Sequence, residues 1–307
     1  MRIAAAAVAL FIAVAAHAVT IAPGDVAVTA PSCLNACIAT PAPPALYVLD
    51  HNLNVKTFHD GYFMAFGPNG HLFTSYGASV TEYDTTLTAV RTFTRPQAST
   101  AALTVDPFGN LLVMSFAGVL TIYSPAGAVL QTISLPFTPT APYPAASLDL
   151  GPDQCTLFYT DGAQSGRRYN ICAQLPLANL PPGSWSAVRT MSDGGYAAAS
   201  GSTLSIFDGQ DHLLRAYTPQ VSDIYALAFD SDPGFILLGT SNGVYRIRLA
   251  DGVPTGHFSS IIVAVAVDGE QRPAAAPLST DIPTLSPPLL FAVALGIMAL
   301  AWQRLRP

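Results

Sequence analysis

The chain has 307 residues, of which 50% are hydrophobic and only 10% are Asp, Glu, Lys or Arg, with a formal net charge of −6 at pH 7. Globular proteins usually contain about 25% charged residues. The chain has a single lysine, Lys56, so it offers no basic track and nucleic acid is excluded as a partner class.

Residues 1–18 predict a secretory signal peptide. Arg2 supplies the positive start, a short apolar run follows, and Ala16-His17-Ala18 fits the pattern of small residues at a cleavage site. We therefore expect the mature chain to begin at Val19. The alternative is an uncleaved membrane anchor.

The segment 19–44 is rich in Pro and Ala and shows little pattern. It contains Cys33 and Cys37, and an even number of cysteines in an exported chain favours disulfides. We expect a local Cys33–Cys37 bridge. A metal site is not expected here, because no histidine or second close cysteine pair accompanies the two thiols.

Residues 45–270 repeat one sequence pattern, in which a β-rich run ends at a polar corner and further β-rich runs follow. A period of about 40 residues with four short strands per unit is typical of a β-propeller blade. Turn chemistry explains most Asp, Asn, Pro and Gly residues at these corners. The corners fall at Gly67, Asp106, Gly151, Ser192, Asp230 and Asp268.

Six corners predict an all-β, six-bladed propeller. The alternative of seven blades needs a further copy of the pattern, which we do not find in the chain. We expect the last blade to pair both ends of the domain, with Ile261–Val267 innermost and Ala45–Asp50 and Asn54–Phe58 outside it. Such a closure leaves no open sheet edge between the first and last blades. The predicted inner strands are 62–66, 101–106, 145–149, 184–190, 224–230 and 261–267.

Cys155 and Cys172 flank a hairpin in the third full blade. The turn between them brings adjacent strands together, which predicts a structural Cys155–Cys172 disulfide. The alternative is two free buried thiols.

Residues 271–281 predict a Pro/Ala linker, and residues 282–307 a transmembrane tail. The apolar stretch Leu285–Trp302 is near the lower length limit for a membrane span, since roughly 17–20 residues are needed. Arg304 and Arg306 follow it and should stay in the cytoplasm, which places the propeller outside.

Ile282-Pro283-Thr284-Leu285, followed by a hydrophobic span and terminal arginines, resembles the IPTL-CTERM sorting tail of Gram-negative bacteria. That tail is related in design to the PEP-CTERM tails that exosortase-type membrane enzymes process. The resemblance implies an exosortase-type partner and localisation at the cell envelope, anchored in the membrane or sorted to the surface. The chain departs from the family pattern after Ser286, where Pro287 and Pro288 stand.

The middle of the chain resembles NHL-repeat, streptogramin-lyase-like and gluconolactonase-type propellers, through VDPFGNLLV (105–113) and two weaker copies, 66–73 and 229–238. The enzymes among these would imply a metal-dependent lactonase or lyase, with Glu, Asn and Asp, or His and Glu, converging on the cation. The predicted inner strands contain no Glu and no Asn. We therefore expect no catalytic residue, metal or cofactor, and keep the enzyme as the alternative.

A binding or scaffold module is the favoured function. Tyr62, Trp185 and Tyr225 fall at the starts of predicted inner strands, where they could line the mouth of the channel, and Arg95 and Tyr143 fall in the adjoining loops. Aromatic side chains with few charges suit an envelope glycan or a protein. Two alternatives stay open: the aromatics pack between blades, or the protein is a structural component without a pocket.

Overall fold

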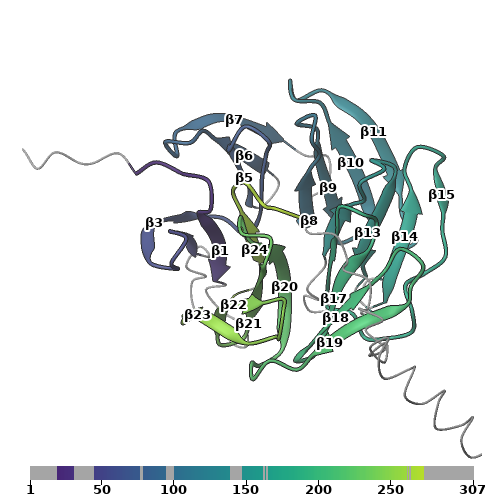
Figure 1. Ribbon diagram of the computed structural model, residues 1–307. Coiled ribbons are helices and arrows are strands. Elements are labelled where there is room, and N and C mark those ends of the chain that lie inside the picture. The colour runs from purple at the N-terminus through teal and green to yellow at the C-terminus, as the bar shows by residue number, and fades with distance from the viewer. Residues whose placement is uncertain are drawn as a thin grey trace, which may run out of the picture.

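The computed structural model describes residues 19–30, 45–76, 79–94, 100–138, 147–161, 163, 165–260, 262 and 264–272. These residues form six four-stranded antiparallel sheets that are arranged as blades in a closed ring (Figure 1). The prediction of an all-β, six-bladed propeller is confirmed. In this described part of the chain, none of the elements is a helix of the length and hydropathy that a membrane crossing needs.

Five blades are continuous in sequence, and each runs outward from its innermost strand. Their strands are β4 (Phe63–Phe66), β5 (Leu72–Tyr76), β6 (Ser79–Tyr83) and β7 (Ala89–Thr94); β8 (Thr100–Val105), β9 (Leu111–Ser115), β10 (Val119–Tyr123) and β11 (Val129–Ser134); β12 (Leu148–Leu150), β13 (Thr156–Thr160), β14 (Gly166–Asn170) and β15 (Leu175–Pro176); β16 (Ala187–Thr190), β17 (Tyr196–Ser200), β18 (Thr203–Phe207) and β19 (Leu213–Tyr217); β20 (Ile224–Phe229), β21 (Phe235–Thr240), β22 (Gly243–Arg248) and β23 (Pro254–Phe258).

The sixth blade joins the two ends of the domain in the order β24 (Ala264–Val267), β1 (Val26–Ala30), β2 (Ala45–Leu49) and β3 (Val55–Asp60). The expected closure is present, but with a strand that the sequence analysis did not predict. Strand β1 lies inside the segment 19–44 and pairs antiparallel with both β24 and β2. Its run VAVTA is almost wholly buried, so the propeller begins at residue 26 rather than at 45.

Four of the corner turns share one backbone geometry. After the inner strand, the backbone amide of one residue donates a hydrogen bond to the carbonyl of the residue three positions earlier. In one of these turns the amide nitrogen of Gly109 lies 3.0 Å from the carbonyl oxygen of Asp106. The Asp106 carboxylate then accepts hydrogen bonds from the amides of Phe108 and Asn110 at 2.8 Å each. Gly109 has a φ of +83°, which glycine adopts without steric cost. The interpretation of Asp106 as a turn residue is confirmed.

The outer strands share a second irregularity. In five blades the pairing of the two outermost strands shifts by one residue at the same place, which is a β-bulge. Bulges twist an exposed edge strand away from regular pairing and so protect it from joining another sheet. The residues that the pairing skips are Lys56, Val90, Leu130, Leu214 and Thr255.

The hydrophobic core is divided into six clusters, one at each junction between neighbouring blades. The cluster between the β12–β15 and β16–β19 blades contains Trp185, Tyr196 and Phe207. Rings stack there, with the centroids of Tyr196 and Phe207 4.9 Å apart. Because strands present alternate side chains to opposite faces, each sheet contributes to two clusters, and the ring closes without an exposed face.

The predicted Cys155–Cys172 disulfide is confirmed. It joins the residue before β13 to the turn after β14, where the two Cα atoms lie 5.3 Å apart. The amide of Ile171 also donates to the carbonyl of Cys155 at 2.9 Å. The bridge therefore links two strands of the blade in which the outermost strand, β15, has only two residues.

Candidate functional site

A central cavity of about 870 Å³ runs along the channel. All six inner strands line it, and their contribution is mainly apolar, as with Met64, Leu103, Leu227 and Val265. Polar side chains gather at the end where the inner strands turn into the second strands. The polar residues at that corner end include Asn69, Asp106, Gln154, Arg189, Asp268, Glu270 and Arg272.

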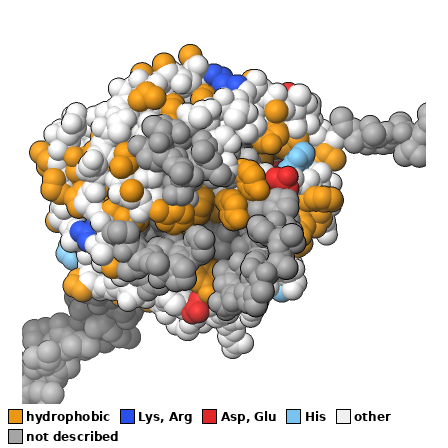
Figure 2. Space-filling model, turned by 180° about the vertical axis from the view of Figure 1, so that it is seen from behind, with side chains coloured by type: hydrophobic (Ala, Val, Ile, Leu, Met, Phe, Trp, Pro, Cys, Tyr) orange, Lys and Arg blue, Asp and Glu red, His pale blue; other side chains and the backbone are white. Residues whose placement is uncertain are grey.

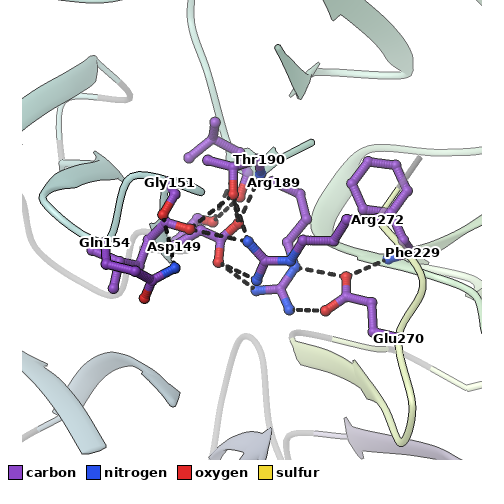
Figure 3. A network of polar contacts seen from close by, with 11 residues as sticks. Asp149, Gly151, Gln154, Arg189, Thr190, Phe229, Glu270 and Arg272 are labelled. Carbon is purple, nitrogen blue, oxygen red and sulfur yellow. Dashed lines mark hydrogen bonds and ion pairs between the residues drawn. The ribbon is translucent and has the colours of Figure 1, made fainter. Parts of the chain in front are cut away.

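A largely buried network of charged groups lies at this end of the cavity (Figure 3). Asp149, at the middle of β12, is fully buried. Its Oδ1 accepts hydrogen bonds from Arg189 Nη1 at 3.2 Å and from Arg272 Nη2 at 2.8 Å. Its Oδ2 accepts from the backbone amide and the hydroxyl of Thr190, each at 2.7 Å. The carboxylate thus has four donors.

Glu270 extends the network to a third blade. Its Oε1 accepts from Arg189 Nε at 2.9 Å and from the backbone amide of Phe229 at 2.7 Å, and its Oε2 pairs with Arg189 Nη2. Arg272 also donates to the carbonyl of Leu150 at 3.0 Å. Two carboxylates and two guanidinium groups therefore neutralise each other beside the cavity.

The electrostatics of the network follow from these contacts. Burial alone would raise the pKa of Asp149, but Arg189, Arg272 and the hydrogen bonds from Thr190 outweigh it, and the pKa is lowered. Burial alone would lower the pKa of Arg189, but Asp149 and Glu270 outweigh it, and the pKa is raised. Asp149 and Arg189 are therefore both charged at neutral pH.

Glu270 and Arg272 belong to the chain that follows β24, and we call residues 268–272 the C-terminal strap. The strap leaves its own blade and reaches the blades of β12, β16 and β20, where the amide of Gln271 also donates to the carbonyl of Asp230 at 2.9 Å. Figure 1 shows this yellow segment passing across the middle of the ring. The strap therefore connects the closing blade to three others.

Asp268, the first residue of the strap, has a different environment. It is 7% exposed and lines the cavity. Burial and the nearby carboxylate of Asp25 raise its pKa, against a hydrogen bond from the amide of Gly269. Asp25 itself pairs with Lys56, at 2.5 Å between Oδ2 and Nζ.

The structure separates the five residues that the sequence singled out for ligand binding. Tyr225 lines the cavity, where burial and then Asp223 raise the pKa of its phenol. Tyr62 is 38% exposed at the start of β4 and stacks on Tyr76, with ring centroids 6.0 Å apart. Arg95 and Tyr143 lie outside the described residues, as do Cys33, Cys37, Ile282–Leu285 and the signal peptide.

Trp185 does not line the channel mouth. It is 7% exposed, packs between two blades and donates from its indole nitrogen to the carbonyl of Pro181 at 2.8 Å. Its ring meets that of Phe207 edge-on at 5.7 Å. The alternative interpretation, in which a propeller aromatic packs between blades, applies to this residue.

Sequence reasoning missed the charged network and the strap. One signal was available: Glu270 is one of only two glutamates in the chain and follows directly after the last predicted corner. Asp149 and Arg189 also lie on neighbouring predicted inner strands. Arg272 falls in the predicted linker, and nothing in its surroundings marks it as part of the domain.

The arrangement does not favour a metal-dependent lactonase or lyase. Among the described residues, no three His, Cys, Asp or Glu side chains converge. The histidines in the described ranges lie on outer strands and turns, and His71 is hydrogen-bonded to Glu82 at 2.7 Å between Nδ1 and Oε1. Asp149, in β12, and Asp106, directly after β8, direct their oxygens at guanidinium groups or backbone amides instead of a shared point.

Known proteins identify the fold and nothing finer. No protein-family model matches the chain, and no curated protein is similar to it. Among solved structures, 1505 chains resemble it. One is a protein of unknown function from Bacteroides caccae, with a TM-score of 0.62 and 12% identity over 81% of this chain and 100% of that one. Such a similarity shows the propeller fold alone.

Proposed function

We propose that this protein is an exported β-propeller of the cell envelope that binds a small ligand in its central cavity. The observation that carries the proposal is the cavity of about 870 Å³, lined by apolar side chains from six inner strands with polar groups gathered at one end. Small-molecule sites are concave, largely apolar and of about 300–1,000 Å³, with a few polar groups that orient the ligand.

The rigidity of the lining supports a preformed site. The blades are packed through six core clusters, and the strap adds ion pairs and hydrogen bonds that connect four blades. A ligand that enters a preformed pocket does not have to order the protein first, so more of the contact energy appears as affinity. A purely structural component without a pocket would need no such cavity.

Export and attachment to the envelope rest on other observations. The Cys155–Cys172 disulfide is of the kind that persists in oxidising compartments. Few charged side chains are visible on the described face in Figure 2, where hydrophobic ones are interspersed with other neutral groups. Together with the signal-like start and the IPTL-like tail, these features support an envelope protein that an exosortase-type enzyme handles.

The cavity is tested by a panel of small amphipathic molecules, screened for shifts in the unfolding midpoint of the full-length chain in a non-ionic detergent. A ligand that binds only the folded state raises the midpoint by mass action. We expect at least one compound to shift the wild type and not the cavity-filling variant Ala65→Phe. A panel without any such compound would count against a cavity ligand.

The tail is tested by replacing Ile282–Leu285 with alanines and following the protein through cell fractionation. We expect the wild type in the envelope fraction, with a size change that depends on the exosortase-type enzyme. Identical size and location for both variants would show that the tail is a plain anchor.

A further inference from the structure

The carboxylate of Asp268 is an unpaired buried charge at the wall of the central cavity. Asp268 is 7% exposed, and among the described residues its carboxylate has no ion pair and no hydrogen bond from a side chain; the amide of Gly269 is its donor. Gly70 lies beside it, and a Cβ built there would be 3.5 Å and 3.6 Å from the two carboxylate oxygens. The absence of a side chain at Gly70 therefore leaves the carboxylate accessible from the cavity.

The other charges at the cavity are compensated inside the protein. Arg189 and Arg272 pair with Asp149 and Glu270. Asp106 accepts hydrogen bonds from two backbone amides and from the side-chain amide of Asn110, at 2.7 Å. Within the described lining, Asp268 is therefore the one charged group with neither a counterion nor a hydrogen bond from another side chain.

An unpaired buried carboxylate is costly, and a cation that enters the site removes that cost. The rest of the wall near the inner strands is mainly apolar and includes Met64, Phe66 and Leu227. The matching ligand thus combines one positive charge with an apolar body.

We propose that the central cavity binds a small organic monocation, an ammonium group on an apolar frame, with the ammonium paired to the carboxylate of Asp268. The proposal rests on the proposed function, in which this cavity is the ligand site, and adds the chemical class of the ligand. An ammonium is a compact donor of three hydrogen bonds, which suits a carboxylate reached from one side.

The affinity depends on pH. The charged groups around Asp268 are Asp25, with Lys56 behind it, and in the strap Glu270 and Arg272, which are engaged with Arg189 and Asp149. Because burial and Asp25 raise the pKa of Asp268, the free protein holds a proton there at a higher pH than an exposed aspartate does. An ammonium displaces that proton, so affinity increases as pH rises through the raised pKa.

The test compares tryptamine with tryptophol, which have the same indole frame and differ in an ammonium or a hydroxyl. Binding to the full-length chain is measured by calorimetry at two pH values, for the wild type, Asp268→Asn and the exposed control Asp60→Asn. We expect tryptamine to bind the wild type and Asp60→Asn equally and Asp268→Asn about 10- to 100-fold more weakly, as for a charge-assisted hydrogen bond. Tryptophol should bind weakly to all three.

Two outcomes overturn the inference, and they differ in what they say of the cavity. Equal binding of tryptamine and tryptophol, unaffected by Asp268→Asn and abolished by Ala65→Phe, keeps the cavity as the ligand site and refutes the cation. Absence of binding by this pair, and by the pairs phenethylamine/2-phenylethanol and cyclohexylmethylamine/cyclohexylmethanol, refutes both. Unfolding midpoints of each variant establish that it is folded.

Discussion

Asp149 and Asp268 are two buried carboxylates at the corner end of one channel, and they differ in what surrounds them. Asp149 is fully buried and has two guanidinium groups and Thr190 as donors. Asp268 is almost as buried but has a backbone amide and a second carboxylate beside it. The pKa of the first is lowered and that of the second is raised. Burial alone therefore does not decide the role of an acidic residue; its donors do.

The difference reflects position in the ring. Asp149 lies where two continuous blades meet, so the neighbouring inner strand supplies Arg189, and the strap supplies Arg272. Asp268 lies at the closure, where its amide donates to the carbonyl of Asp25 at 2.9 Å and where, among the described residues, no arginine pairs with its carboxylate. The carboxylate of Asp149 is paired within the protein, whereas that of Asp268 is open to a ligand.

The largest expected effect is that of removing the shared arginine. Arg189→Met takes one guanidinium from Asp149 and leaves Glu270 with the amide of Phe229. Breaking a buried ion pair from one side typically costs about 3–5 kcal/mol. We expect the free energy of unfolding, measured with denaturant, to fall by about that amount. The control is Arg248→Met, whose exposed pair with Asp251 is screened by solvent and should contribute much less to stability. Equal losses in both variants would refute a structural role for the network.

A smaller loss is expected when the strap alone is released. Arg272→Met removes the hydrogen bonds to Asp149 and to the carbonyl of Leu150, but Asp149 keeps Arg189 and Thr190. Losing hydrogen bonds to a charged group costs about 1.5–3 kcal/mol. Hydrogen exchange should also become faster in β24, since the strap holds that strand to the other blades. Unchanged exchange in β24 would show that the strap does not stabilise the closure.

At Asp268 we expect a substitution to increase the stability of the fold instead of lowering it. Asp268→Asn keeps the shape and removes a buried charge without a counterion, so at neutral pH the variant should be about 1 kcal/mol more stable than the wild type. The same experiment on Asp149→Asn should give a loss, because two guanidinium groups would face an uncharged amide. A loss of stability in Asp268→Asn would mean that the carboxylate has a compensating partner after all.

The sequence was informative where turn chemistry repeats. The corners at Gly67, Asp106 and Asp230 could be located because each turn needs residues that tolerate a left-handed φ or bond the nearby backbone. The strand β1 could not be located, since five residues of Val, Ala and Thr among prolines form no repeat of their own. It becomes a strand only because it can pair with β24 on one side and with β2 on the other.

The candidate site was less predictable for a related reason. Tyr225, near the start of an inner strand, lines the cavity. Trp185 follows the same rule in sequence, yet its ring turns into the blade junction, where Phe207 and Tyr196 offer more apolar contact. The network needed residues 149, 189, 270 and 272 to meet, and such long-range encounters leave no periodic pattern. Local chemistry can be derived from sequence, whereas side-chain direction and long-range ion pairs depend on packing.

The smallest expected effect is on the pH dependence of stability. This dependence should have opposite signs for Asp149 and Asp268. Asp268 is a carboxyl group whose pKa is higher in the folded protein than in the unfolded chain, where it is about 3.9. Below the pKa of the unfolded chain such a group does not destabilise the fold. As pH rises from there through the pKa of the folded protein, it increasingly destabilises the fold. The advantage of Asp268→Asn should therefore vanish below about pH 3 and grow toward neutrality. Asp149, with a lowered pKa, acts in the other direction, because its stabilisation is lost as pH falls below about 3.9. Unfolding curves of the wild type and Asp268→Asn should thus converge in acid while both lose stability. A difference that is constant from pH 3 to 8 would mean that Asp268 is not the group that titrates, and that the cavity carries no unpaired charge there.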